Sequence, residues 1–370
     1  MITIKNVRTL GGEVVTHTIE SSHAYDIDAQ ENLLLFPGLI DPHVTFGAVE
    51  QDNWNLSVES SIRGGVTTAI DILPVSFIHK SKKDLEIANE RIEKRLAELK
   101  IPLGYFRFLP YKQETLSEIE QLGGKKPFAK GIVIQFEEED FHDLEGKWED
   151  LFRLAAHEDL PVVINSRNEN TLAWDMKKEH SLLENGIQHA EKWGCRLLVL
   201  NVSTLREIEL IKAARKKQVL VYAETTPQHL FSQTNDTRVL WEALNQDLIE
   251  VIGSGYDGTQ PGEERIVYRG ANFSAADPLF LLPRLMTAYH QKKILIEKLY
   301  HLTSTNIQDI LELKKTRNFV LVDLEHEETL TVLREGKSSQ LKLKGWPAYT
   351  IVDGHVFSPP QSGYSLQHLN

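Results

Sequence analysis

The stretch Arg196–Thr225, RLLVLNVSTLREIELIKAARKKQVLVYAET, contains a strand, a helix and a second strand in succession. The apolar runs RLLVLNVS and VLVYAET are typical of parallel strands that are buried on both faces. Between them, apolar residues recur at helical spacing, and Thr204 followed by Glu207 has the spacing of a capping box at a helix N-terminus. Because parallel strands need a crossover connection, this stretch predicts a parallel sheet.

The same alternation extends from about Leu34 to about Leu313. The segment Lys82–Leu99 places its apolar residues at spacings of three and four, which predicts an amphipathic helix. Eight apolar runs are strand candidates: LLLFPGLID (33–41), TTAIDILP (67–74), LGYFRFLP (103–110), KGIVIQF (130–136), PVVINS (161–166), RLLVLNVS (196–203), VLVYAET (219–225) and LIEVIGSG (248–255). Eight strands that alternate with helices predict an α/β fold, a TIM-type (β/α)8 barrel over residues 37–313.

The two ends of the chain show a different pattern. Residues 1–20 have apolar alternation around Gly11-Gly12, and residues 318–335 and 347–358 have the same strand-turn-strand character. We therefore expect residues 1–36 and 314–370 to form a small β-sandwich beside the barrel.

Composition excludes several classes of partner. The 370 residues include 53 acidic and 41 basic side chains, and the formal charge of -12 opposes binding to nucleic acid or to an anionic membrane. No apolar stretch approaches the roughly 20 residues that span a bilayer, so we expect a cytoplasmic protein. The single cysteine, Cys195, cannot form an intrachain disulfide, and its position beside an apolar strand predicts burial.

Four segments resemble the cyclic-amidohydrolase branch of the amidohydrolase superfamily, and dihydroorotases most closely. They are Pro37–His43 (PGLIDPH), Gly64–Pro74 (GGVTTAIDILP), Glu224–Phe231 (ETTPQHLF) and Gly345–Phe357 (GWPAYTIVDGHVF). The resemblance covers nearly the whole chain in order. It implies a barrel with one or two divalent metal ions, zinc in this family, at the C-terminal mouth, where active sites of this fold lie.

The resemblance also locates the metal ligands of the family, and most of them are missing here. The family has a His-x-His pair after its first strand, and this chain has His43 followed by Thr45. The carboxylated lysine of the fourth strand aligns, within about one residue, with Val133, and Lys130 lies too early in the strand to replace it.

The remaining ligand positions have changed as well. The histidines of the fifth and sixth strands correspond to Asn165 and Asn201, and the aspartate of the eighth strand, which is also the family's proton shuttle, corresponds to Gly255. The family's arginine that binds the substrate carboxylate aligns with Gly47, and the family's substrate-binding asparagine aligns with Val75. Zinc requires histidine nitrogen, thiolate or carboxylate, so we expect no metal or other cofactor and no intact catalytic residue.

Other sites stay open as alternatives. If the last loop contains two additional residues, Asp257 could occupy the place of the aspartate and act with His43. The run Gly253–Gly258 (GSGYDG) matches G-x-G-x-x-G, but it does not lead straight into a helix and is therefore a weak signal for dinucleotide binding. A phosphate-binding site at this last barrel loop stays an alternative. Polar residues at or near predicted strand ends, which could form a rebuilt pocket, are His43, Asp71, Glu137, Arg167, Glu224, His229, Tyr256 and Asp257.

From these observations we expect a catalytically inactive dihydroorotase homologue that serves as a structural subunit. The family resemblance implies aspartate transcarbamoylase as its partner in pyrimidine biosynthesis, together with or in place of homo-oligomer formation. The alternatives are a diverged dihydroorotase or another cyclic-amide hydrolase with a rebuilt site, and a small-molecule sensor whose emptied pocket binds a ligand.

Overall fold

The computed structural model describes residues 1–47, 52–72, 82–111, 116, 120, 129–135, 148–165, 176–232, 236–258, 264–358 and 367–368. The chain separates into two compact units, which are treated one at a time. Unit 1 comprises Met1–Ala69, Lys94–Gly104 and Gly253–Asn370, and unit 2 comprises Ile70–Glu93 and Tyr105–Ile252. The boundaries of the sandwich and the barrel that the sequence suggests stay a prediction.

Eight strands hydrogen-bond to one another in chain order. They are β5 (Leu39–Val44), β6 (Val66–Ile72), β7 (Gly104–Pro110), β8 (Ala129–Gln135), β9 (Val162–Asn165), β10 (Leu197–Leu200), β11 (Val221–Thr225) and β12 (Val251–Ile252). The pairs from β7 to β12 are parallel, and Val44 of β5 forms a parallel bridge with Tyr256 beyond β12. This is the strand order that the alternating sequence pattern predicts.

The helices include those that the sequence predicts. The predicted helix over residues 82–99 forms, and the predicted capping box is present, with Glu207 N donating to Thr204 Oγ1 (3.3 Å) and Thr204 N donating to Glu207 Oε2 (2.9 Å). The described helices are α1 (Asp52–Arg63), α2 (Lys82–Leu99), α4 (Trp148–His157), α5 (Met176–Trp193), α6 (Leu205–Lys216), α7 (Pro227–Phe231), α8 (Asp236–Asn245), α9 (Leu281–His290), α10 (Ile296–Tyr300) and α11 (Asn306–Ile310), with a 3-10 turn at Pro278–Phe280 and a π-helical turn at His301–Thr305. Of the helices that the structure describes, none combines the length and the apolar character needed to cross a membrane.

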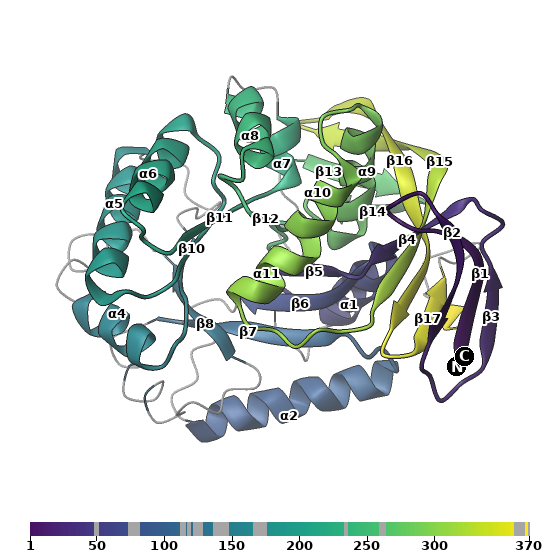
Figure 1. Cartoon of the computed structure of the whole chain (residues 1–370), viewed down its shortest axis with the longest axis horizontal. Helices are drawn as coiled ribbons and strands as arrows, with labels where there is room; N and C mark the ends of the chain where they lie inside the picture. The colour runs from purple at the N-terminus through teal and green to yellow at the C-terminus, as the bar shows by residue number, and fades with distance from the viewer. Residues whose placement is uncertain are drawn as a thin grey trace. The chain divides into compact units, whose positions relative to one another are not determined.

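Unit 1 contains a ten-stranded sheet built from both ends of the chain. Its strands are β1 (Ile2–Arg8), β2 (Val14–Ile19), β3 (Tyr25–Asp28), β4 (Leu33–Pro37), β13 (Glu264–Tyr268), β14 (Ala271–Ser274), β15 (Phe319–Arg334), β16 (Lys337–Val352), β17 (His355–Ser358) and β18 (Gln367–His368). Figure 1 shows β1 to β4 beside β15 to β17, and the pairing of β4 with β15 joins the two ends of the chain.

The first predicted strand, LLLFPGLID, is in fact two strands in different sheets. Residues Leu33–Pro37 form β4 of the ten-stranded sheet, whereas Leu39–Val44 form β5 of the eight-stranded sheet. The chain passes from one sheet to the other at Gly38. A side chain does not fit there, because a Cβ at this position would lie 2.3 Å from Thr67 Oγ1. An apolar run records burial but not the sheet to which each half belongs, so the sequence did not reveal this break.

The hairpin of β13 and β14 also joins the sheet of unit 1, although its residues fall within the segment expected to form the barrel. Tyr268 of β13 stacks on Trp346 with ring centroids 5.4 Å apart, and the Phe280 ring meets Trp346 edge-on at 6.4 Å. These buried aromatic rings form an apolar cluster between the sheet and the segment that precedes α9.

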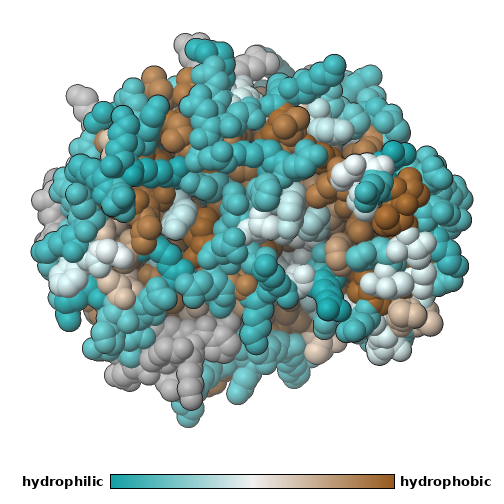
Figure 2. All heavy atoms as spheres, viewed as in Figure 1, coloured by the Kyte–Doolittle hydropathy of each residue, from teal (hydrophilic) through white to brown (hydrophobic). Residues whose placement is uncertain are grey.

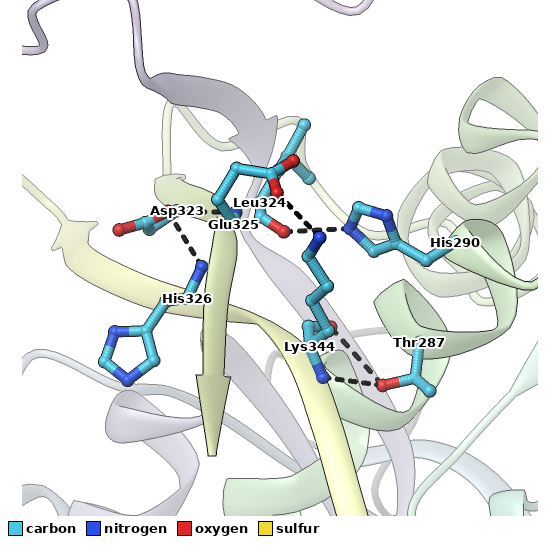
Figure 3. A network of polar contacts seen from close by, with 7 residues as sticks. All are labelled: Thr287, His290, Asp323, Leu324, Glu325, His326 and Lys344. Atoms are coloured by element: carbon cyan, nitrogen blue, oxygen red, sulfur yellow. Dashed lines mark hydrogen bonds and ion pairs between the residues drawn. The ribbon is translucent and has the colours of Figure 1, made fainter.

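Polar contacts fix α9 to the paired strands β15 and β16 (Figure 3). Lys344 N donates to Thr287 Oγ1 (2.8 Å), and the Nε2 atom of His290 hydrogen-bonds to the Leu324 carbonyl (2.8 Å). Lys344 Nζ also pairs with Glu325 at 2.6 Å. The Leu324 and Glu325 contacts lie where the register of the two strands shifts, so the helix docks on an irregular part of the ladder.

Unit 2 contains the parallel strands from β7 to β12, with helices packed along them. Helix α5 packs against β10 and α6 against β11, and Figure 1 shows α4, α5 and α6 next to one another along these strands. On the face drawn in Figure 2, hydrophilic side chains cover most of the surface and hydrophobic ones form small patches between them. Within unit 2 the strands are largely buried, including all of Leu197–Leu200.

Arg215 connects α6 to the end of the parallel sheet in unit 2. Its guanidinium donates to the Val221 and Asp247 carbonyls (2.9 Å each) and to Glu250 Oε2 (2.7 Å). Glu250 Oε2 in turn accepts from Ala223 N at 3.0 Å. The side chains of Arg215 and Glu250 are only 22% and 19% exposed, so solvent screens this pair weakly.

Asp277 is a fully buried carboxyl in unit 1, and it predicts how stability depends on pH. It accepts a hydrogen bond from Leu279 N (3.0 Å), and burial raises its pKa to about 6. A raised carboxyl pKa contributes stability that is complete below the unfolded-state pKa near 4 and is lost as the pH rises through about 6. Between pH 4 and pH 7 the free energy of unfolding of the wild type should therefore fall by roughly 3 kcal/mol relative to Asp277→Asn, as measured by urea denaturation. Parallel pH curves for the two proteins would contradict this prediction.

Removing the Arg215 guanidinium should destabilise unit 2. Arg215→Gln leaves the Glu250 carboxylate buried without its cation, so the free energy of unfolding should fall by about 3 kcal/mol in urea denaturation. The matched control is Arg238→Gln, because Arg238 is 78% exposed and pairs with Glu242 on one helix face, where the loss should stay below about 1 kcal/mol. Equal losses in the two variants would show that burial of the Arg215 pair does not matter.

Candidate functional site

In unit 1, Asp41 and His43 mark the carboxyl end of the first barrel strand. They are separated by one residue on β5, so they share a face of the strand, and both are buried. Asp41 Oδ1 accepts hydrogen bonds from His43 N (3.2 Å) and from Ser254 N (2.9 Å). Burial raises the pKa of Asp41 to about 6, although the Ser254 and His43 hydrogen bonds act in the opposite direction. This carboxyl holds the first strand to the segment that follows β12.

Tyr256 continues the same connection. Its backbone N donates to the His43 carbonyl (3.1 Å), and Thr45 N donates to its carbonyl (2.6 Å). Its hydroxyl hydrogen-bonds with Ser57 Oγ (3.0 Å) and donates to the Gly258 carbonyl (2.7 Å). Burial raises the pKa of the phenol, and Asp277 raises it further. The Tyr256 hydroxyl therefore stays protonated, and it serves to fix residues 253–258.

The loop after β12 lies directly against the end of β5. Gly258 adopts φ +85°, and a Cβ there would lie 2.1 Å from the Thr45 carbonyl oxygen, so only glycine fits. Gly255, the position that the resemblance assigns to the family's aspartate, adopts φ +70° and has no side chain to offer. Asp257 is partly exposed.

In unit 2, Asn165, Asn201 and Glu224 lie at the carboxyl ends of three neighbouring strands, β9, β10 and β11. Asn201 Nδ2 donates to Asn165 Oδ1 at 2.8 Å, and Asn201 N donates to Glu224 Oε2 at 2.8 Å. Asn201 adopts φ +63°, a left-handed conformation that asparagine tolerates better than most residues. The fully buried Glu224 carboxylate thus holds the turn that points the Asn201 amide toward Asn165.

Val133 lies on the same face of the sheet as Asn165. It is completely buried and lies opposite Val163 in the parallel register of β8 and β9. Paired residues of a parallel sheet point to the same face, so Val133 and Val163 share the face of Asn165, two residues beyond Val163. A valine thus stands on the face where the resemblance places the family's lysine.

Other expected site residues have different surroundings or fall outside the described ranges. Asp71 accepts a hydrogen bond from the Tyr105 hydroxyl, and His229 Nδ1 hydrogen-bonds with Thr226 Oγ1 at 3.3 Å. Gly47 is partly exposed with φ +79°. Val75, Glu137 and Arg167 lie outside the residues that the structure describes.

The prediction that Cys195 is buried is confirmed. Its side chain is 4% exposed, and burial raises the pKa of the thiol to about 11. Such a thiol is almost entirely protonated at neutral pH, which makes it a poor nucleophile.

Sequence reasoning did not identify Asp41 or Ser254 as parts of this region. The spacing of Asp41 and His43 was available as a signal, since residues two apart on a strand share a face. Ser254 offered no comparable signal, because its contact with Asp41 joins positions 213 residues apart. The hydrogen bond between Asn165 and Asn201 likewise depends on how two separate strands are placed.

A structural metal centre needs several ligating side chains in one place. In the described ranges, no group of three or more His, Cys, Asp or Glu side chains is placed to hold a metal ion. Around Asn201 the side chains are two neutral amides, and the nearby Glu224 carboxylate accepts a backbone N–H.

Sequence relatives match this chain over most of its length. An allantoinase of Desulfitobacterium hafniense is 25% identical, over 90% of this chain and 88% of the relative. A dihydroorotase of Methanosphaera stadtmanae is 23% identical, over 84% of this chain and 82% of the relative. No protein-family model matches the chain.

Solved structures confirm the predicted barrel with its flanking β-sandwich. A D-hydantoinase crystal structure superposes with a TM-score of 0.74 at 17% identity and covers 99% of this chain and 96% of its own. The inactive dihydroorotase-like domain of the Chaetomium thermophilum CAD-like multifunctional protein superposes with a TM-score of 0.65 at 17% identity, over 88% of this chain and 94% of its own. The chain is therefore similar in sequence, over most of its length, to allantoinases and dihydroorotases, and similar in fold to a D-hydantoinase.

Proposed function

We propose that this dihydroorotase-like chain does not hydrolyse cyclic amides and serves as a structural subunit of an assembly. The hydrogen bond between the Asn165 and Asn201 side chains, 2.8 Å long, carries the proposal. In the family these two positions hold histidines that bind the metal. Here each amide is engaged with the other, and a neutral amide is a much weaker zinc donor than an imidazole.

The other ligand positions support the same conclusion. Val133 is completely buried and offers only methyl groups at the position of the family's lysine. Thr45 and Gly255 replace a histidine and an aspartate, and both belong to backbone that is tied to the Tyr256 segment. The residues present do not fit zinc, and we assign no catalytic step to a metal ion.

Loss of the aspartate affects catalysis independently of the metal. In the family this residue transfers a proton during ring opening, and Gly255 cannot do so. Asp41 is a described buried carboxyl near His43; its Oδ1 atom accepts two backbone hydrogen bonds, and its Oδ2 atom is buried without a hydrogen-bond partner among the described residues. Metal-dependent attack and proton transfer would therefore both be impaired.

A role in assembly is the function that a retained barrel without this chemistry can still perform. One solved neighbour of the fold is itself described as an inactive dihydroorotase-like domain of a multifunctional protein. From the family resemblance we propose aspartate transcarbamoylase as the partner, with self-association of the chain as a further contribution to the assembly. The net charge of -12 leaves nucleic acid an unfavourable partner.

Metal content tests the inactive site directly. Protein expressed with added zinc should contain less than about a tenth of an equivalent of metal per chain by elemental mass spectrometry. It should also fail to turn over dihydroorotate, hydantoin or allantoin, whereas a dihydroorotase relative prepared in the same way provides the positive control. Near-stoichiometric metal, with turnover that His43→Ala and Asp257→Ala both abolish without unfolding the chain, would contradict the proposal and favour a hydrolase with a rebuilt site.

Co-purification tests the proposed partner. A tagged chain isolated from its native cell should recover aspartate transcarbamoylase, identified by mass spectrometry, and the mixture should elute earlier from a sizing column than either protein alone. A tag-only preparation from the same cell is the control. Recovery of the chain without transcarbamoylase would refute the partner while leaving the metal measurement to decide on inactivity.

A further inference from the structure

Arg284, in the first turn of α9 in unit 1, is a buried cation without a counter-ion among the described residues. Its side chain is only 6% exposed. Its Nε atom is buried and has no hydrogen-bond acceptor, and no described residue forms an ion pair with the guanidinium. Burial lowers the pKa of Arg284, but an arginine remains protonated in proteins, so the positive charge persists.

Arg63 and Arg107 also have a buried Nε atom without an acceptor, but both of these arginines take part in further interactions. Arg215 has the Glu250 carboxylate at hydrogen-bond distance, and Arg107, 1% exposed, donates to Asn89 Oδ1 at 3.5 Å. Arg63, 7% exposed, lies close enough to Asp277 for the carboxyl to affect its pKa. Buried charges are normally paired, and an unpaired one points to a missing partner.

The carboxylate of Glu264, in β13, interacts electrostatically with the Arg284 guanidinium without a hydrogen bond or an ion pair. The Glu264 carboxylate opposes the effect of burial on the pKa of Arg284. Glu264 is 37% exposed and its ion-pair partner is Arg334, at 3.9 Å. It therefore compensates the charge of Arg284 incompletely.

The helix geometry places Arg284 in apolar surroundings. Residues three and four apart share a helix face, so Arg284 lies between Phe280 and Thr287. Phe280 packs edge-on against Trp346 and Tyr268, and Thr287 contacts the Lys344 backbone. A charge beside such a cluster is poorly solvated, which strengthens its attraction for an anion.

We propose that Arg284 binds a small oxyanion, namely inorganic phosphate or the carboxylate or phosphate group of a small ligand. The planar guanidinium matches these groups with two parallel N–H···O bonds. With only 6% of its surface exposed to water, Arg284 offers too little surface for another macromolecule to dock on it. The site is independent of the proposed scaffold role.

Anion-dependent thermal stability of the full chain tests this site. Unfolding temperatures are compared in sodium chloride, sodium phosphate and sodium acetate at equal pH and ionic strength, and dissociation constants for phosphate and acetate follow from calorimetric titration. At about ten times the dissociation constant, the bound anion should raise the unfolding temperature by about 2 °C relative to chloride. The phosphate and acetate arms show which oxyanion the site prefers.

Three variants and a control distinguish a specific site from a general salt effect. Arg284→Met should lose the stabilisation, and Arg284→Lys, which retains the charge but not the planar fork, should bind at least tenfold more weakly. Glu264→Gln should bind several-fold more tightly, because it removes a carboxylate that repels the anion. Arg238→Gln, on an exposed helix face, should behave as the wild type.

Three outcomes would overturn the proposal. The first is no stabilisation of the wild type by either anion, and the second is equal stabilisation of the wild type and Arg284→Met. The third is weaker anion binding in Glu264→Gln, which would identify Glu264 as the partner that Arg284 requires. Should Arg284→Met fail to fold, Arg284→Lys and Glu264→Gln still give opposite predicted changes in affinity.

Discussion

Burial of both faces of the parallel strands is the constraint on which the rest of this structure depends. In β5 and β6 every residue is buried, and β10 is buried throughout as well. Asn165 and Asn201 of the candidate site lie where strands end, and in a parallel arrangement those ends lie at one edge of the sheet. The fold thus determines where chemistry can occur, while the residue types at strand ends determine whether it does.

Buried carboxylates in this chain hold backbone N–H groups. Asp41 accepts from His43 and Ser254, Glu224 accepts from Asn201, and Asp277 accepts from Leu279. Each acid secures a turn or the start of a helical segment, where backbone N–H groups lack partners within the element. A carboxylate oxygen that is engaged in this way stabilises local geometry, whereas the Oδ2 atom of Asp41 is buried without a hydrogen-bond partner among the described residues. This use of acidic residues agrees with a barrel whose architecture has been retained while its ligand positions have changed.

Much of the fold was accessible from local patterns. The helix over residues 82–99 and the capping box of Thr204 and Glu207 form as predicted, because helical spacing and capping depend on residues a few positions apart. The division of LLLFPGLID between two sheets was not accessible. It depends on the close approach of Thr67 to Gly38, and this contact exists only in the folded chain.

For the candidate site, the sequence by itself determined which residue types stand at the ligand positions: Thr45, Val133, Asn165, Asn201 and Gly255. Only the tertiary structure decided what those residues do instead. It joined the Asn165 and Asn201 amides, tied Asp41 to a residue 213 positions away, and left the Arg284 charge buried without a described counter-ion. The physical reason is that residue identity and periodicity are local properties, whereas hydrogen-bond partners and burial are set by segments that meet only when the whole chain has folded.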